Sequence, residues 1–144
     1  SYTGAGTTIA IIDDGFDVDH PEYQRSDETS AILSTSRYYY ASGNNALYQS
    51  YSSNPDAIKE DWNTYYGEWD THGTNTSTTA AAPMDNGGGV GIAPGADILA
   101  LKIDFTFVAI KAAIQYAIAQ DVDVINMSLG AYCEDFTDAF GDSQ

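Results

Sequence analysis

Residues 7–12 read TTIAII, and this stretch decides the fold. It is short, apolar and rich in β-branched side chains, and Gly6 and Asp13 bound it. A continuous apolar run of this kind is typical of a strand that is buried on both faces of a parallel sheet. Two later stretches have a similar character, at residues 96–103 and 122–127, and we predict that both are strands as well.

Helices are expected between these strands. Residues 107–119 carry apolar side chains at positions 110, 114, 117 and 118, which is the spacing of an amphipathic helix. Residues 74–82 are rich in Thr, Ser and Ala, and small side chains suit a helix that packs tightly through the core. The alternation predicts an α/β fold, a three-layer parallel sheet with right-handed crossovers and helices on both faces. Three strands cannot cover their own core, so the sheet is incomplete in this chain and residues 1–144 should not be stable alone.

The composition bounds the class of protein. At 144 residues the chain is one domain or a large part of one, and 43% hydrophobic residues are ordinary for a globular chain. The net charge of −16 disfavours binding to nucleic acids and to anionic membranes. It suits a secreted or salt-tolerant protein, or one that holds divalent cations, although a solvated acidic surface is the simpler interpretation. Cys133 is the only cysteine, so no internal disulfide can form, and no run approaches the roughly 18 apolar residues of a membrane span.

Two residues stand out as an acid and a base. Asp13 ends the first predicted strand, and Ser128 ends the third, at the edge of a parallel sheet where functional groups gather. His72 lies at the start of the small-residue run. A buried carboxylate can bond one imidazole nitrogen, fix the tautomer and stabilise the imidazolium, which frees the other nitrogen to act as a general base. A lone histidine is more often a surface or structural residue, so the context decides its role.

Three motifs give that context. Residues 11–22 read IIDDGFDVDHPE, residues 71–74 read THGT and are followed by VGIAPGA at 90–96, and residues 123–130 read DVINMSLG. In this order they resemble the aspartate, histidine and substrate-binding motifs of the subtilisin-like serine proteases, the subtilases. Residues 1–144 are similar to the N-terminal, Asp- and His-bearing part of that catalytic domain. The aspartate region and the long stretch after it also resemble the branch of the cell-envelope proteases and C5a peptidases.

The resemblance implies a role for each motif. Asp13 would be the acid that orients His72, and His72 would be the general base. Ser128, Leu129 and Gly130 would form an edge that pairs with the backbone of an extended polypeptide substrate, because main-chain hydrogen bonds give affinity to an added strand. Without the resemblance, this edge reads as a plain turn after a strand.

A structural calcium ion is a further expectation from the resemblance. Glu22 stands where many family members carry a calcium-binding acid, and Asp85 falls in the glycine-rich loop that supplies oxygen ligands. Asp14, Asp17 and Asp19 are interpreted as turn carboxylates, since their spacing lacks an EF-hand loop. No organic cofactor is expected.

Two parts of the catalytic machinery have no counterpart in this sequence. The nucleophilic serine of the family lies in a Gly-Thr-Ser type segment and the oxyanion asparagine in an Ala-Gly-Asn type segment after the third strand, and residues 1–144 hold neither. We therefore expect a serine endopeptidase for which this chain supplies Asp13 and His72. The serine and the asparagine would lie in the remainder of the precursor or in a second chain. The alternative is a catalytically inactive relative that serves as a binding or scaffold module.

Other departures from the family pattern concern the helix and the groove. Asp14 stands where Thr or Ser is commoner, and a second carboxylate there should favour protonated His72 and move the activity profile to higher pH. Residues 76–78 (TST) replace small apolar residues, which affects the packing of the helix. The chain is short between residues 103 and 113, so the outer specificity pocket departs from the family pattern as well.

A long polar stretch, residues 24–70, separates the first strand from the first helix. It holds seven of the eleven tyrosines and both tryptophans. A loop of this length without secondary structure is improbable in a compact domain, so we expect short elements within it. Because aromatic side chains offer large contact areas at low entropic cost, this Tyr-rich insertion either rims the active site, contacts a propeptide or packs on its own domain.

The setting in which the protein acts follows from the family and from the charge. We expect a secreted or cell-surface protein, with a propeptide or inhibitor as a further partner. Residues 1–6 are small and polar and resemble the start of a chain that has been proteolytically processed.

Overall fold

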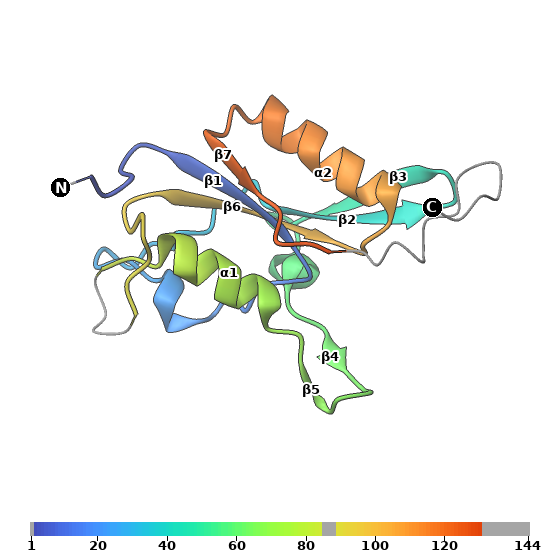
Figure 1. The fold of residues 1–144 in the computed structure, drawn as a ribbon, viewed down its shortest axis with the longest axis horizontal. Coiled ribbons are helices and arrows are strands. Elements are labelled where there is room, and N and C mark those ends of the chain that lie inside the picture. The colour runs from blue at the N-terminus through green and yellow to red at the C-terminus, as the bar shows by residue number, and fades with distance from the viewer. Residues whose placement is uncertain (1, 85–88, 131–144) are drawn as a thin grey trace.

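A central sheet with one helix on each face organises the structure (Figure 1). The computed structural model describes residues 2–84 and 89–130. The strands of the sheet are β1 Thr8–Asp13, β2 Arg37–Ser42, β3 Asn45–Ser50, β6 Asp97–Ile103 and β7 Val124–Asn126. They lie in the order β3-β2-β6-β1-β7. Two short 3₁₀ helices, η1 Pro21–Tyr23 and η2 Pro55–Ile58, lie in the connections.

β1 lies between two parallel neighbours. It pairs with β6 on one side, where Asp13 is opposite Lys102, and with β7 on the other, where Ile11 is opposite Asn126. Its side chains alternate between the faces of the sheet, so that Ile11 and Ile12 enter two different core clusters. The three strands that the sequence predicted are thus confirmed, and their carboxyl ends share one edge.

The polar stretch 24–70 contributes two further strands, whose positions were not predicted from the sequence. β2 pairs in parallel with β6, and β3 folds back on β2 as an antiparallel edge strand. The turn between them contains Gly43 with a φ of +61°, a conformation that suits a two-residue hairpin loop. The sheet is therefore parallel except for this edge, and four of the seven tyrosines of residues 24–70 lie on its strands.

The helices cover opposite faces of the sheet, as predicted (Figure 1). They are α1 His72–Ala81 and α2 Phe107–Ala119. The buried side of α2 consists of the alanines at positions 109, 113 and 117, whereas Ile118 is 66% exposed. The predicted apolar stripe is therefore wrong at Ile118, because the small alanines turn toward the sheet instead. In the described parts of the chain, no helix is long and apolar enough to cross a membrane.

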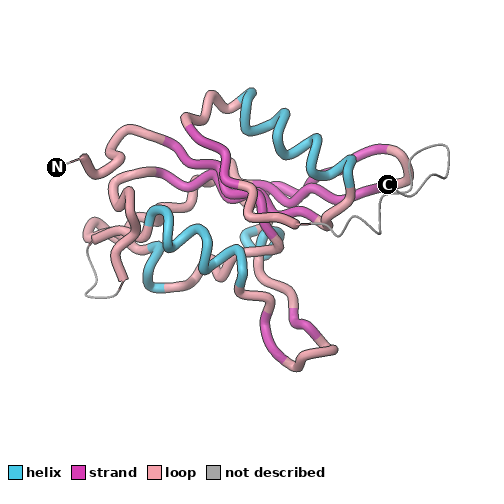
Figure 2. The backbone as a smooth tube through the Cα atoms, viewed as in Figure 1, coloured by secondary structure: helices cyan, strands magenta, loops and turns pink. Residues whose placement is uncertain are grey.

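A small hairpin precedes α1 and extends away from the sheet (Figure 2). Its strands are β4 Trp62–Asn63 and β5 Glu68–Trp69, and the indole rings of its two tryptophans meet edge to face with their centroids 5.4 Å apart. Lys102 at the end of β6 holds the base of this hairpin. Its buried ammonium donates to the carbonyl oxygen of Lys59 at 2.6 Å and pairs with the Asp61 carboxylate at 2.8 Å.

Candidate active site

The carboxyl end of β1 meets the first residue of α1. The Nδ1 atom of His72 lies 2.8 Å from Oδ1 of Asp13, although 59 positions separate the two residues in the sequence. Gly73 makes this approach possible, because a Cβ built on it would lie 2.1 Å from the carbonyl oxygen of Gly15. The start of α1 therefore lies close against the end of β1 and the turn that follows it, and this close approach brings the two side chains within hydrogen-bonding distance.

The carboxylate of Asp13 is fully buried and held by several donors. Oδ1 accepts the backbone N–H of Asp14 at 2.8 Å, in addition to its contact with His72. Oδ2 accepts the hydroxyl of Thr76 at 2.9 Å. A buried charge is stable only when donors satisfy its oxygens, and these bonds meet that need.

The imidazole of His72 is oriented on one side and accessible on the other. Its side chain is 55% exposed, which leaves Nε2 accessible while Nδ1 contacts Asp13. The hydrogen bond to Asp13 is the main cause that raises the pKa of His72. Partial burial opposes this increase, and the negative charges of Asp13 and Asp14 add to it. This arrangement can accept a proton at Nε2 and stabilise the resulting charge.

Asp14 completes a cluster of three titratable groups. Partial burial raises its pKa to about 6, although its Oδ1 accepts the backbone N–H of Gly73 at 2.9 Å. Side-chain atoms of Asp13, Asp14 and His72 that could bind a metal lie within 4.8 Å of one another. Since hydrogen bonds already engage an oxygen of each carboxylate and the Nδ1 of His72, the cluster fits an acid–base pair better than a metal centre.

Replacing Asp14 with asparagine should move the pH profile of activity to lower pH. The base must be neutral to act, so activity rises with pH through the pKa of His72. Asp14 carries a negative charge that raises this pKa, and asparagine removes the charge. Below about pH 6 Asp14 is itself protonated, so the two profiles should converge there. If Asp14→Asn does not shift the profile of kcat/KM against pH, Asp14 does not raise the pKa of His72 in this way.

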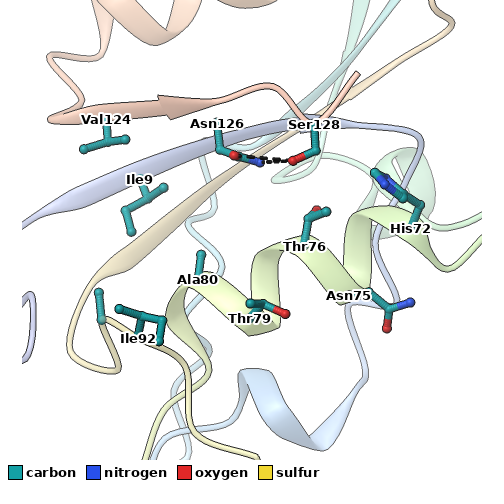
Figure 3. Close-up of a pocket in the computed structure, with 11 residues that line it drawn as sticks. Ile9, His72, Asn75, Thr76, Thr79, Ala80, Ile92, Val124, Asn126 and Ser128 are labelled. Carbon is teal, nitrogen blue, oxygen red and sulfur yellow. Dashed lines mark hydrogen bonds between the residues drawn. The ribbon is translucent and has the colours of Figure 1, made fainter. Parts of the chain in front are cut away.

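A groove of about 590 Å³ runs from His72 along α1 to β7 (Figure 3). Ser128 lies on its wall, and its hydroxyl accepts a hydrogen bond from the side-chain amide of Asn126 at 3.0 Å. Leu129 packs partly against the core under α2, and a Cβ added at Gly130 would meet nothing within 4 Å. The structure therefore brings Ser128 to the same groove as His72, while Leu129 faces the core.

A second cavity of about 490 Å³, which was not predicted from the sequence, lies on the other side of His72. The hairpin β4–β5 and the start of α1 form its walls. Three carboxylates, those of Asp14, Glu68 and Asp70, line it together with the half-exposed indole of Trp69. The run of Glu, Trp and Asp just before Thr71 was the signal for it in the sequence.

Glu22 faces the loop in which the calcium ion was expected. Its Oε1 accepts the backbone N–H of Gly89 at 3.2 Å, and its own N–H donates to Nδ1 of His20. Asp85, the second expected ligand, lies outside the described residues. Glu22 thus contacts the described part of this loop at Gly89.

Comparisons with known proteins identify the family to which the chain is similar. The model of the subtilase family matches residues 4–143. An intracellular serine protease of Paenibacillus polymyxa is 33% identical over 132 residues, which are 88% of this chain and 34% of that protein. Subtilisin E of Bacillus subtilis is 31% identical over 134 residues, or 90% of this chain and 28% of that protein. The minor extracellular protease Vpr of the same species is 29% identical over 134 residues, or 90% of this chain and 14% of that protein.

A solved structure shares the fold. The CspB protease of Clostridium perfringens superposes with a TM-score of 0.59 at 18% sequence identity, over 94% of this chain and 32% of that one. The chain therefore spans about a third of the length of the first relatives that it matches. The names of these relatives include both an intracellular and an extracellular protease.

Proposed function

The chain belongs to the subtilase family, and we propose that it supplies the acid and the general base of a serine endopeptidase. The observation that carries this proposal is the 2.8 Å contact between His72 and the buried carboxylate of Asp13. A nucleophilic serine and an oxyanion asparagine would come from the remainder of the precursor or from a second chain produced by processing.

The mechanism follows from the geometry of this pair. Nε2 of His72 would take the proton of the serine hydroxyl as the oxygen attacks the scissile carbonyl carbon. Asp13 would hold the ring in the required tautomer and stabilise the imidazolium. The same proton would then pass to the leaving amine, and a water molecule activated in the same way would release the acid.

The polypeptide substrate would lie along the groove between α1 and β7. The edge formed by Ser128, Leu129 and Gly130 would pair with the extended backbone of the substrate, since it begins two residues after the end of β7 and Ser128 lines the groove with His72. This pairing would place the scissile bond near Nε2.

A serine-directed phosphonate tests this function against its alternative. In the complete protein, we expect the reagent to label one serine outside residues 1–144, and we expect His72→Ala to abolish the labelling. The alternative is an inactive binding or scaffold module that has kept Asp13 and His72 without a nucleophile. No labelling of the complete protein, together with no Gly-Thr-Ser type segment in its remaining sequence, would select the module.

The acidic cavity predicts a preference among substrates. Asp14, Glu68 and Asp70 make its potential negative, so peptides that place Lys or Arg there should be cleaved about tenfold faster than peptides with Glu, which corresponds to about 1.4 kcal/mol. Glu68→Lys should reduce this ratio of kcat/KM values, and added salt should reduce it too. Glu28→Lys makes the same change of charge outside both cavities and should leave the ratio unaltered. Equal ratios for Glu68→Lys and the wild type would contradict the prediction.

Location and calcium binding are two further parts of the proposal. A secreted or cell-surface location fits the net charge of −16 and the extracellular relatives, and a propeptide or inhibitor would be a further partner. A calcium ion would use the carboxylate of Glu22, with Asp85 as a second ligand. Calcium should raise the melting temperature of the complete protein, and Glu22→Gln should diminish that rise.

A further inference from the structure

The second oxygen of Asp13 is bonded by a hydroxyl on α1. Thr76 lies four residues after His72, so both side chains project from the same face of the helix. The Thr76 hydroxyl lies 2.9 Å from Oδ2 of Asp13 and 3.1 Å from the carbonyl oxygen of Gly73. A hydroxyl has one proton to donate, and the shorter contact to the charged acceptor is the stronger of the two.

Oδ2 of Asp13 relies on the Thr76 hydroxyl for its hydrogen bond. Asp13 is fully buried, so bulk water does not solvate its carboxylate. The backbone N–H of Asp14 bonds Oδ1, and the Asp14 side chain is itself a carboxylate. Among the bonds of the described residues, Thr76 supplies the one side-chain donor to Oδ2. Without it, a buried charged oxygen would lose its partner, which is costly.

We propose that Thr76 is a positioning residue for the acid–base pair. The torsion that turns a carboxylate about its last bond is broad, so one hydrogen bond does not fix its plane. The Asp14 N–H on Oδ1 and the Thr76 hydroxyl on Oδ2 together fix that plane and direct Oδ1 at Nδ1 of His72. The catalytic part of this inference rests on the proposed peptidase function, whereas the positioning of Asp13 does not.

Variants of Thr76 separate the hydroxyl from the packing. In the complete protein, Thr76→Val keeps the volume and removes the hydroxyl, while Thr76→Ser keeps the hydroxyl and removes a methyl group. We expect Thr76→Val to lower kcat by about 10- to 100-fold, because a misdirected Asp13 misplaces His72, and Thr76→Ser to stay within about threefold of the wild type. A packing role predicts the reverse order of the two variants. Thr78→Val removes a hydroxyl that bonds back to Thr74 within the same helix, and it should leave kcat unaltered.

A spectroscopic signature decides the question independently of activity. The ¹H resonance of the His72 Nδ1 proton reports its hydrogen bond to Asp13. We expect this resonance in the wild type and in Thr76→Ser, and its loss or upfield movement in Thr76→Val. If Thr76→Val does not fold, Thr76→Ala takes its place.

Each outcome bears on the proposal. An unaltered resonance in Thr76→Val, or equal losses of kcat in the Val and Ser variants, would overturn it. A protein that shows the resonance and its dependence on Thr76 but cleaves no peptide would refute the proposed peptidase function while supporting the role of Thr76.

Discussion

Replacing His72 with alanine should lower the kcat of the complete protein for peptide hydrolysis by about a millionfold, because the members of an acid–base–nucleophile triad act as a unit. The reason is that no other group in the described chain is placed to take the proton from a nucleophile beside Asp13. Asp13→Asn should cost about ten-thousandfold, because the amide can hold His72 in the wrong tautomer and cannot stabilise the imidazolium. Single-turnover hydrolysis of a chromogenic peptide measures both losses.

The second histidine of the chain provides the matched control. His20 accepts a hydrogen bond from the backbone N–H of Glu22 at the start of η1, away from Asp13. His20→Ala should therefore leave kcat within a few-fold of the wild type. Equal losses for the two histidine variants, or a His72→Ala variant with nearly full activity, would show that His72 is not the base.

Replacing Gly73 with alanine should have the next largest effect. An added Cβ would lie 2.1 Å from the carbonyl oxygen of Gly15 and 3.1 Å from Cβ of Asp13, so the start of α1 must move away from the end of β1. Forced overpacking of this kind costs about 1–3 kcal/mol of unfolding free energy and sometimes more. A displacement of His72 by about 1 Å should lower kcat about a hundredfold in the protein that remains folded.

Gly43 provides a control position, at which an added Cβ would strain the backbone without contacting another residue. Gly43 has a φ of +61° but nothing within 4 Å of an added Cβ. Gly43→Ala should cost about 1–2 kcal/mol through its left-handed conformation and leave kcat unaltered. Urea unfolding and kcat measured on both variants test this contrast. A Gly73→Ala variant with wild-type stability and activity would mean that the close approach of β1 and α1 does not position the pair.

The sequence was sufficient to predict the centre of the fold. The apolar stretch at residues 7–12 reads as a buried strand because no other element suits a short, β-branched run between Gly6 and Asp13. The motifs around Asp13 and His72 then paired two residues that the structure brings to 2.8 Å. The local sequence pattern and the family resemblance were enough to predict this pair, because one residue lies at the end of a strand and the other at the start of a helix.

The rest depended on contacts between distant segments. The tyrosines of β2 showed no clear alternation, and only pairing with β6 and the turn at Gly43 makes this segment a strand. The apolar pattern of α2 predicted that Ile118 is buried. In the structure, the helix packs its alanines against the sheet instead, and Ile118 lies on the exposed side of the helix. The bond from Thr76 to Asp13 had one signal, its spacing of four residues from His72, yet its partner is set by how α1 packs on β1.

The most direct test of the central claim is a titration of His72 by NMR in the complete protein, with Asp13→Asn as the comparison. If the buried carboxylate and the imidazole form one acid–base pair, His72 titrates at a higher pH than an ordinary histidine, and Asp13→Asn lowers its pKa. If His72 titrates as an exposed histidine does, and Asp13→Asn leaves its pKa in place, the two side chains do not act together and the account of this chain as the acid–base half of a peptidase fails.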